Sequence, residues 1–259
     1  MFQEERLAAI LEHLKRNKRI EVEQVCELLS ISRDTARRDI IKLEERGCII
    51  RTRGGAVLPT ISKEMPNYGQ RLQKETTSKQ MIGHVAASLL HDDDYIYMDS
   101  STTVRYVGEY MKTKRNVIVT NSIDMAGMLA ERNLARIQLL GGLLDNNQRM
   151  IYGSRAIEMM SDYHFDKAFL GTCGLSMNGL TTDFEEETYL IRQVIRNADQ
   201  VIILADHSKF GKTMFHRVAG LEDIDFIVTD REPDTDWQRH VNELGVEIII
   251  ADKEERGAP

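Results

Sequence analysis

One loop of the sequence carries an acid followed by four hydroxyl side chains. Its residues are Asp99, Ser100, Ser101, Thr102 and Thr103. The loop comes directly after an apolar run at 95–98 and leads into a helical pattern. Hydroxyl groups and free backbone N–H groups at the start of a helix can bind an anion. An ordinary helix cap without a ligand is the commoner use of such a cluster, so the loop alone does not decide between the two.

Polar or glycine residues also follow the other short apolar runs of the same region. These residues are Asn121, Gly141, Gly142, Gly171 and Asp206. In open α/β sheets, ligands bind at the carboxyl ends of the strands. Lys209 could supply a cation there, although a solvated loop lysine is the simpler interpretation. We interpret His207 as a structural, hydrogen-bonded residue, because no second metal ligand lies at a useful spacing.

A second group of chemically active residues lies near the amino terminus. Its members are Ser32, Arg33, Thr35, Arg37, Arg38, Arg51 and Arg53. Arginine can bind guanine in a bidentate manner or hold a phosphate, and hydroxyl groups suit phosphate oxygens. The alternative is a helical protein–protein module in which Arg37 pairs with a nearby acid. We expect Asp39 to be an ion-pair partner inside this region.

The elements that position these residues follow from apolar spacing. Leucine and isoleucine at i, i+3, i+4 and i+7 predict a helix around 7–14, and the spacing repeats at 22–29. A third helix begins at Ser32, a plausible cap. Residues 48–58 then place apolar stretches on both sides of a Gly-Gly pair, which predicts a two-stranded wing. Together these elements predict a winged helix-turn-helix, whose second helix enters the major groove.

The rest of the chain alternates amphipathic segments with short apolar runs. The predicted strands are 95–98, 117–120, 137–140, 168–170, 201–205, 226–229 and 246–250. Such alternation predicts an α/β domain with a mainly parallel sheet covered on both faces. Pro59 and Pro66 lie in a stretch without clear periodicity. We therefore expect a DNA-binding domain at 1–58, a linker at 59–77 and a larger domain at 78–259.

Composition and charge restrict the class of protein. The 259 residues carry a net charge of −7. Residues 1–58 hold 12 basic and 10 acidic side chains, and the remainder holds 22 and 31, so the first part is +2 and the second −9. A local basic face can still bind DNA. Three scattered cysteines indicate no disulfide framework or zinc site. With no signal pattern and no run long enough to span a bilayer, we expect a cytoplasmic protein without membrane contact, metal or cofactor.

The amino-terminal motifs resemble the DeoR family of bacterial transcriptional regulators. Residues 35–40 read Thr-Ala-Arg-Arg-Asp-Ile, where the family usually has Thr-Ile-Arg-Arg-Asp-Leu. Residues 51–56 read Arg-Thr-Arg-Gly-Gly-Ala, where it has Arg-x-His-Gly-Gly-Ala. Ala36 and Arg53 are therefore departures, and Arg53 adds charge to the wing. The resemblance extends over roughly residues 4–251.

The larger domain resembles the DeoR effector domain, which is similar in fold to ribose-5-phosphate isomerase and CoA transferases. The resemblance implies that residues 100–103 and Lys209 hold a phosphate. It also implies that Asp99, Asn121 and Glu187 contact sugar hydroxyls, and it places Gly142 in the effector-binding site. Ser101 stands where the family often has Gly, and Val104 where it has Thr. A need for positive φ at 101 would change the loop and weaken the phosphate assignment.

The expected function is a repressor that a phosphorylated sugar releases from double-stranded operator DNA. We expect a homo-oligomer, either dimer or tetramer, because one head reads too few bases. The alternative is a sugar-phosphate isomerase with a DNA-binding appendage. The loop at 171–174 reads Gly-Thr-Cys-Gly, without the acid that isomerases of this fold carry, so we expect no catalytic residues. A third hypothesis is a scaffold that only oligomerises.

Overall fold

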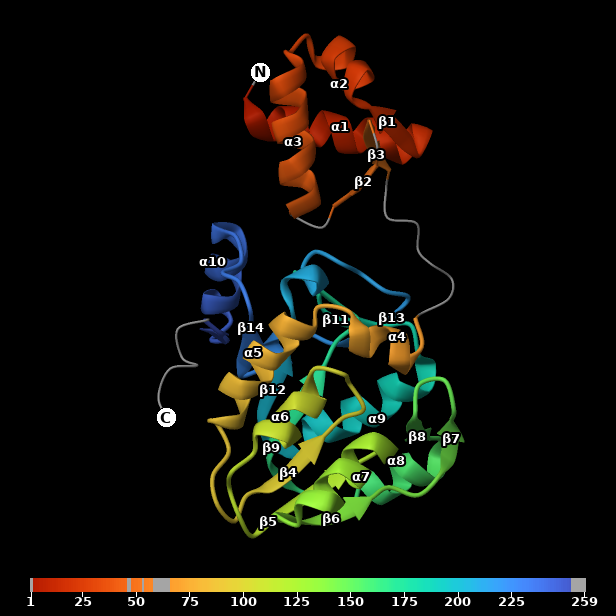
Figure 1. The fold of residues 1–259 in the computed structure, drawn as a ribbon, viewed down its shortest axis with the longest axis vertical. Helices are drawn as coiled ribbons and strands as arrows, with labels where there is room; N and C mark the ends of the chain where they lie inside the picture. The colour runs from red at the N-terminus through yellow and green to blue at the C-terminus, as the bar shows by residue number, and fades with distance from the viewer. Residues whose placement is uncertain (1, 46–47, 53, 58–65, 253–259) are drawn as a thin grey trace. The chain divides into compact units, whose positions relative to one another are not determined.

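The computed structural model describes residues 2–45, 48–52, 54–57 and 66–252. The chain divides into two compact units, residues 1–65 and residues 66–259 (Figure 1). We call the first unit the head and the second unit the body.

The head consists of three helices and a small antiparallel sheet. Its elements are α1 (Gln3–Asn17), β1 (Arg19–Glu21), α2 (Val22–Leu29), α3 (Arg33–Glu45), β2 (Ile50–Thr52) and β3 (Gly55–Val57). The strand order is β1-β3-β2, so the predicted two-stranded wing gains a third strand from the segment before α2. Ser30 has a left-handed backbone between α2 and α3, and the Ser32 hydroxyl accepts from the backbone N–H of Thr35 at 3.3 Å. This confirms the predicted cap and the winged helix-turn-helix.

The predicted apolar positions form the core of the head. Its buried side chains include Leu7, Ile10, Leu14, Val22, Val25, Leu29, Ala36, Ile40 and Leu43. Each of the three helices contributes one stripe at helical spacing, so the helices bury one face each against a shared centre.

One charged group lies inside this core. Asp39 is fully buried on α3, and its carboxylate accepts from the Nε of Arg6 on α1 at 2.7 Å and from another guanidinium nitrogen at 3.1 Å. The Gln3 amide donates to the same carboxylate at 3.3 Å. The Asp39 carboxylate in turn raises the pKa of Arg6. The ion pair expected for Asp39 is therefore present, and it joins α1 to α3.

The body is built on a seven-stranded parallel sheet. Its strands are β4 (Tyr95–Met98), β5 (Asn116–Thr120), β6 (Ala135–Leu139), β9 (Phe165–Gly171), β12 (Ala198–Leu204), β14 (Phe226–Thr229) and β15 (Glu247–Ile250). Its helices are α4 (Tyr68–Gln73), α5 (Thr76–Ala87), α6 (Val104–Tyr110), α7 (Ile123–Arg132), α8 (Ser154–Met160), α9 (Glu185–Arg196) and α10 (Thr235–Glu243). All seven predicted runs lie in this sheet, which confirms the α/β fold class.

Successive side chains of the central strands enter two different cores. In β4, Tyr97 joins the core that includes residues of α8, α9 and α10. Its neighbours Ile96 and Met98 join the core that includes residues of α5, α6 and α7. This alternation is the period of two that a strand imposes. Near-continuous apolar strands are required because both faces are covered.

The order of strands in the sheet reverses at one place. The order is β15-β14-β12-β9-β4-β5-β6, so the chain runs outward in one direction from β4 and in the other from β9. Loops leaving two such strands diverge to opposite sides and open a crevice at their carboxyl ends. The site should therefore lie beyond Met98 and Gly171.

Several short elements were not predicted from the sequence. An antiparallel sheet contains β10 (Gly174–Ser176), β11 (Gly179–Thr182) and β13 (His216–Ala219), and a hairpin contains β7 (Leu143–Asp145) and β8 (Met150–Tyr152). Two 3-10 turns, η1 (His207–Lys209) and η2 (Leu221–Asp223), complete the body. These short strands mix apolar residues with glycine and polar residues, so they lack the continuous apolar runs that marked the strands of the parallel sheet.

The predicted linker at 59–77 differs from the structure in its second half. Helix α4 lies within that range, and the Tyr68 backbone N–H donates to the Asn147 carbonyl at 2.9 Å. Residues 66–77 therefore belong to the body, and the preceding part of the range, 59–65, lies outside the described residues. Within the described part of the chain, no helix is long and apolar enough to cross a membrane.

We expect Asp39→Ala to lower the melting temperature of the head, because it leaves the Arg6 guanidinium without its carboxylate. The measurement is thermal unfolding followed by circular dichroism. The control is Glu12→Ala, which removes the exposed Glu12–Arg16 pair on α1 and should cost at most about 0.5 kcal/mol. Equal shifts in the two variants would show that the buried pair does not stabilise the head.

Candidate functional site

Asp99 connects the two strands at which the sheet order reverses. It follows β4 and is 3% exposed. One carboxylate oxygen accepts from the Ser101 backbone N–H at 2.8 Å, and the other accepts from the Gly171 backbone N–H at 2.7 Å. A Cβ added at Gly171 would lie 2.3 Å from the Ser101 Cβ. Glycine is therefore required at the end of β9 for this close approach.

A pocket opens at this junction. Its lining residues are Arg71, Asp99, Ser101, Gly171, Thr172, Cys173, Leu180, Thr181, Thr182, Glu187, Ile191 and Val218. They come from α4, from the ends of β4 and β9, and from β11, α9 and β13. The body thus has a concave site at its strand-order reversal, where ligands of open α/β sheets bind.

Two carboxyl groups that line this pocket have raised pKa values. Burial raises the pKa of Asp99 to about 6, against the lowering effect of its two backbone hydrogen bonds. Burial also raises the pKa of Glu187, while the Thr182 hydroxyl, which donates to it at 2.7 Å, lowers it. Burial raises the pKa of the Cys173 thiol to about 11, so this thiol is protonated at neutral pH and is a poor nucleophile.

Arg71 brings a positive charge to the opposite wall. Its guanidinium donates to the Gln148 side chain at 2.9 Å and lies 5.8 Å from the centre of the Tyr68 ring. Its Nε is buried and has no hydrogen-bond partner among the described residues. A buried donor without an acceptor costs free energy. The Nε of Arg71 could therefore donate a hydrogen bond to an acceptor on a ligand.

Three lysines add positive charge around Arg71. Lys79 on α5 is 3% exposed and donates to the Arg71 backbone carbonyl. Burial lowers the pKa of Lys79 to about 8, and the charges of Lys209 and Arg71 lower it further, while Asp206 opposes the shift. Burial and the charge of Lys209 likewise lower the pKa of Lys212. We call Arg71, Lys79, Lys209 and Lys212 the cationic cluster.

Lys209 lies on a loop that is fixed from both sides. Asp206 accepts from the Ser208 backbone N–H at 2.9 Å. His207 bonds through Nδ1 to Asp230 at 2.8 Å, and its backbone N–H donates to the same carboxylate at 2.6 Å. This pairing raises the pKa of His207. His207 thus has the structural role that we expected.

The structure brings only some of the predicted effector residues into the pocket. Asp99, Ser101 and Glu187 line it, and Lys209 belongs to the cationic cluster. Ser101 is not among the residues with positive φ, so the difference from the family's glycine does not distort the loop. The neighbouring backbone N–H groups of Thr102 and Thr103 have no acceptor in the described part of the chain.

Three predicted effector residues have other roles in the structure. The Asn121 amide is occupied on both sides, because it accepts from the Tyr97 hydroxyl at 3.2 Å and donates to the Ile151 carbonyl at 3.3 Å. Gly142 has a φ of +155°, and a Cβ there would lie 2.5 Å from the Tyr152 carbonyl oxygen. The Ser100 hydroxyl points to the Met150 sulfur at 3.6 Å. None of the three lines the pocket.

Arg71 and Lys79 were not identified from the sequence. Arg71 lay in a stretch without periodicity, so no neighbouring pattern marked it. Lys79 offered a signal, because it shares a helical stripe with Ile82, Gly83 and Ala86, all of which are buried. Lysine is rarely buried unless its charge has a partner or a function. Lys79 is buried against Arg71.

In the head, the predicted DNA-binding arginines are exposed on α3 and the wing. Arg37 and Arg38 form no ion pair with any described residue, so the alternative in which Arg37 pairs with an acid is not supported. Arg33 pairs with Glu23 at 2.6 Å, and Arg51 pairs with Glu44 at 3.3 Å. Ser32 and Thr35 bond to each other through their hydroxyls at 2.9 Å. Arg53 lies outside the described residues.

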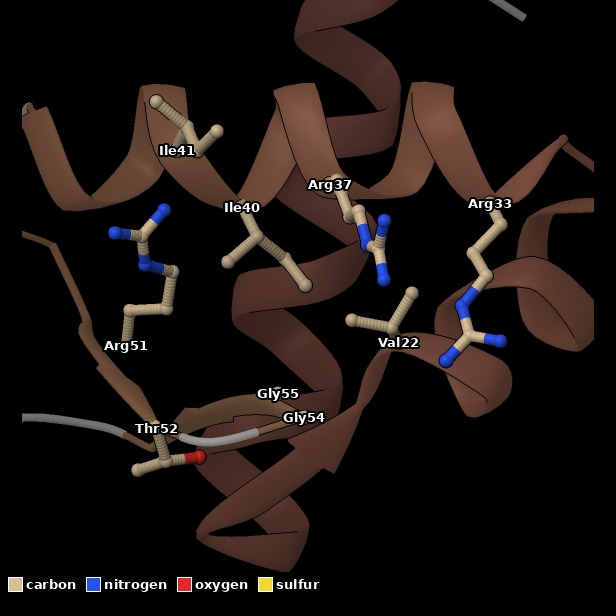
Figure 2. A pocket seen from close by; sticks show the side chains of 9 residues that line it. All are labelled: Val22, Arg33, Arg37, Ile40, Ile41, Arg51, Thr52, Gly54 and Gly55. Carbon is tan, nitrogen blue, oxygen red and sulfur yellow. The ribbon is translucent and has the colours of Figure 1, made fainter.

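A hollow lies between α3 and the wing. It is lined by Val22, Arg33, Arg37, Ile40, Ile41, Arg51, Thr52, Gly54 and Gly55. Figure 2 shows the Arg37 side chain pointing from α3 toward the hairpin, the Arg33 side chain pointing toward the start of α2, and the Arg51 side chain pointing from β2 toward α3. No acid lines it, so the head presents a positive surface at the place where a winged helix meets DNA.

Two family models match the chain. Residues 6–62 match the DeoR-like helix-turn-helix domain, and residues 74–231 match the DeoR C terminal sensor domain. The chain is similar in fold to ribose 5 phosphate isomerase A from Neisseria gonorrhoeae, with a TM-score of 0.38 and 14% identity over 60% of this chain and 58% of that one. A likeness of this size carries no argument about function.

Two relatives match nearly the whole chain. The HTH-type transcriptional repressor GlcR of Bacillus subtilis is 46% identical over 255 residues, 98% of this chain and 99% of that protein. The glycerol-3-phosphate regulon repressor of Escherichia coli is 30% identical and covers 90% and 93%. With a winged helix-turn-helix that presents unpaired arginines and a sensor domain with a charged pocket, the chain belongs to the DeoR family of DNA-binding transcriptional regulators.

Proposed function

We propose that this protein is a repressor of a carbohydrate-metabolism operon and that a phosphorylated sugar releases it from its operator. The pocket at the strand-order reversal carries the proposal, because two carboxyl groups line it together with Arg71, which belongs to the cationic cluster. A relative named as repressor of the glycerol-3-phosphate regulon supports a phosphorylated effector. Relatives named as regulators favour this function over the isomerase alternative.

The phosphate of the effector binds the cationic cluster. A phosphate leaves water only for several charged donors, which Lys209, Lys79 and the Nε of Arg71 supply. The unpaired N–H groups of Thr102 and Thr103 are further donors. Asp206 lies close enough to affect the pKa of both Lys79 and Lys212, and it keeps the lysines together in the absence of ligand.

The sugar hydroxyls bind at the acidic end of the pocket. Glu187 accepts one hydrogen bond from Thr182 and retains acceptor capacity for a sugar hydroxyl. Both oxygens of Asp99 are already bonded to backbone N–H groups. Asp99 therefore serves first to hold the loop at 99–103 against β9, and any contact with the sugar is additional to that role.

Two heads act as a pair in this proposal, through a homodimer or homotetramer. A single helix-turn-helix reads too few bases for useful specificity. The effector must bind one conformation of the protein more tightly than the other, since equal affinity would shift nothing. The heads contact DNA through the arginines of α3 and the wing.

Replacing both Arg37 and Arg38 with Ala should abolish specific operator binding. A good base contact contributes about 1–3 kcal/mol, and a phosphate contact adds affinity that does not depend on sequence, so loss of both arginines removes most of the affinity for the operator. The measurement is affinity for an operator fragment that the wild-type protein selects from a randomised duplex pool. The control is Lys15→Ala with Arg16→Ala, which removes two exposed charges from α1. A folded Arg37/Arg38 variant with unchanged affinity would contradict this assignment.

Lys209→Ala should weaken binding of the effector by about tenfold or more, because charged hydrogen bonds contribute about 1.5–3 kcal/mol each. Calorimetry with a panel of phosphorylated sugars measures this effect, and operator affinity should remain the same. Lys112→Ala is the control, since this exposed lysine follows α6 at the opposite edge of the sheet. Saturating operator DNA must also weaken effector binding by the factor by which effector weakens DNA binding. Equal effector affinity with and without DNA would rule out the proposed release.

Glu187→Gln should stabilise the body increasingly as pH rises from 4 to 8. The raised pKa of Glu187 means that ionisation is less favourable in the folded protein. The stability that the protonated carboxyl provides is complete below its ordinary pKa of about 4.3 and is lost as pH rises through the folded value. Gln can still accept from Thr182.

The melting-temperature difference from wild type should be near zero at pH 4 and positive at pH 8. Glu185→Gln, exposed on the same helix, should show no such trend; a flat difference for Glu187→Gln would contradict the cause.

A further inference from the structure

The hollow between α3 and the wing has an uneven distribution of charge. Arg33 lies at one end and pairs with Glu23, and Arg51 lies at the other end and pairs with Glu44. Arg37 lies between them on α3 (Figure 2) and forms no ion pair with any described residue. The middle of the hollow therefore carries a positive charge that no described residue of the head neutralises through an ion pair.

Part of the lining is apolar. Val22, Ile40 and Ile41 contribute aliphatic side chains beside Arg37, and Ile41 is 36% exposed. A free anion such as inorganic phosphate gains nothing from such surface. A deoxyribose ring attached to a phosphate does, because its carbon atoms can pack against aliphatic side chains while the phosphate meets the guanidinium.

The hairpin is shaped to let another backbone approach. Gly54 has a φ of +104°, and the space beside its Cα is open within 4 Å. A Cβ at Gly55 would lie 2.1 Å from the Ile20 carbonyl oxygen, so this residue must be glycine for β1 and β3 to pair. The only hydroxyl side chain of the lining is the exposed Thr52. At Gly54 and Gly55 the described part of the hairpin therefore presents backbone without a side chain to the hollow.

We propose that the hollow binds the sugar-phosphate backbone of one DNA strand, with Arg37 holding a single phosphate, and that Arg38 reads a base. This assignment rests on the proposed operator binding. It gives Arg37 a contact with the DNA backbone and Arg38 a contact with a base. Arg38 is exposed, forms no ion pair in the described part of the chain and does not line the hollow. One residue further along α3, its side chain leaves the helix at about 100° from that of Arg37, so it is directed away from the hollow and is available for a different contact.

The two roles predict different behaviour in salt. Each neutralised phosphate contributes about 0.9 to the slope of log affinity against log salt concentration. Arg37→Ala should therefore reduce the slope by about 0.9 per bound head. It should weaken binding to a selected operator and to an unrelated duplex by the same factor. Arg38→Ala should instead reduce the ratio between operator and unrelated duplex by roughly tenfold or more.

A second measurement locates the phosphate. Single neutral methylphosphonates placed along the operator should weaken wild-type binding at several positions. At one position per half-site, neutralisation should have no further effect in Arg37→Ala, because the contact is already lost. Arg37→Gln, which keeps part of the aliphatic side chain, tests whether loss of packing explains the result, and it should give the same salt slope as Arg37→Ala. Arg16→Ala removes an equal charge from α1 and should leave every position unchanged.

Three results would overturn the assignment while operator binding itself remains. The first is an unchanged salt slope in a folded Arg37→Ala protein. The second is a loss of discrimination in Arg37→Ala as large as that in Arg38→Ala. The third is that every methylphosphonate position weakens binding by the same factor in the wild-type and the Arg37→Ala proteins. If the wild-type protein selects no DNA sequence and binds no duplex, both this assignment and the proposed operator function fail.

Discussion

The hydrogen bonds of the Asp99 carboxylate hold the sensor site together. They join the loop after β4 to the end of β9, the two strands at which the order of the sheet reverses. That reversal opens the crevice, and the two bonds set how closely its walls approach. Gly171 allows the contact, because a side chain there would occupy the position of Ser101. A carboxylate held between backbone N–H groups at this junction is therefore structural as well as part of the pocket.

The pocket uses burial to control charge. Desolvation raises the pKa of Asp99 and of Glu187, which line the pocket, and it lowers the pKa of Lys79 and of Lys212 in the cationic cluster. In each case burial disfavours the charged form, so each of these groups, when charged, costs free energy. A ligand with an anionic end and a hydroxylated end would compensate the cations and bond to the carboxyl groups. This arrangement favours a sensor whose stability depends on its effector.

The head separates structural charge from functional charge along one helix. Asp39 is fully buried and pairs with Arg6, whereas Arg37 and Arg38 are exposed and form no ion pair with described residues. The buried pair fixes α3 against α1, and the exposed arginines keep their charge available for DNA. This division lets a protein with a net charge of −7 present a positive docking surface, because only the docking face must meet phosphate.

The sequence by itself determined the helices of the head, the seven strands of the sheet and the residues at their carboxyl ends. Apolar residues repeat with the period of the element that buries them, so these features are local. It also indicated the Asp39 ion pair and the structural role of His207. Only the tertiary structure decided which side chains meet. Arg71 bonds to Gln148, 77 residues away, and Lys79 turns inward beside it, while Asn121 uses its amide on Tyr97 and Ile151. Such contacts depend on how distant elements pack, and neither periodicity nor the spacing of residues encodes them.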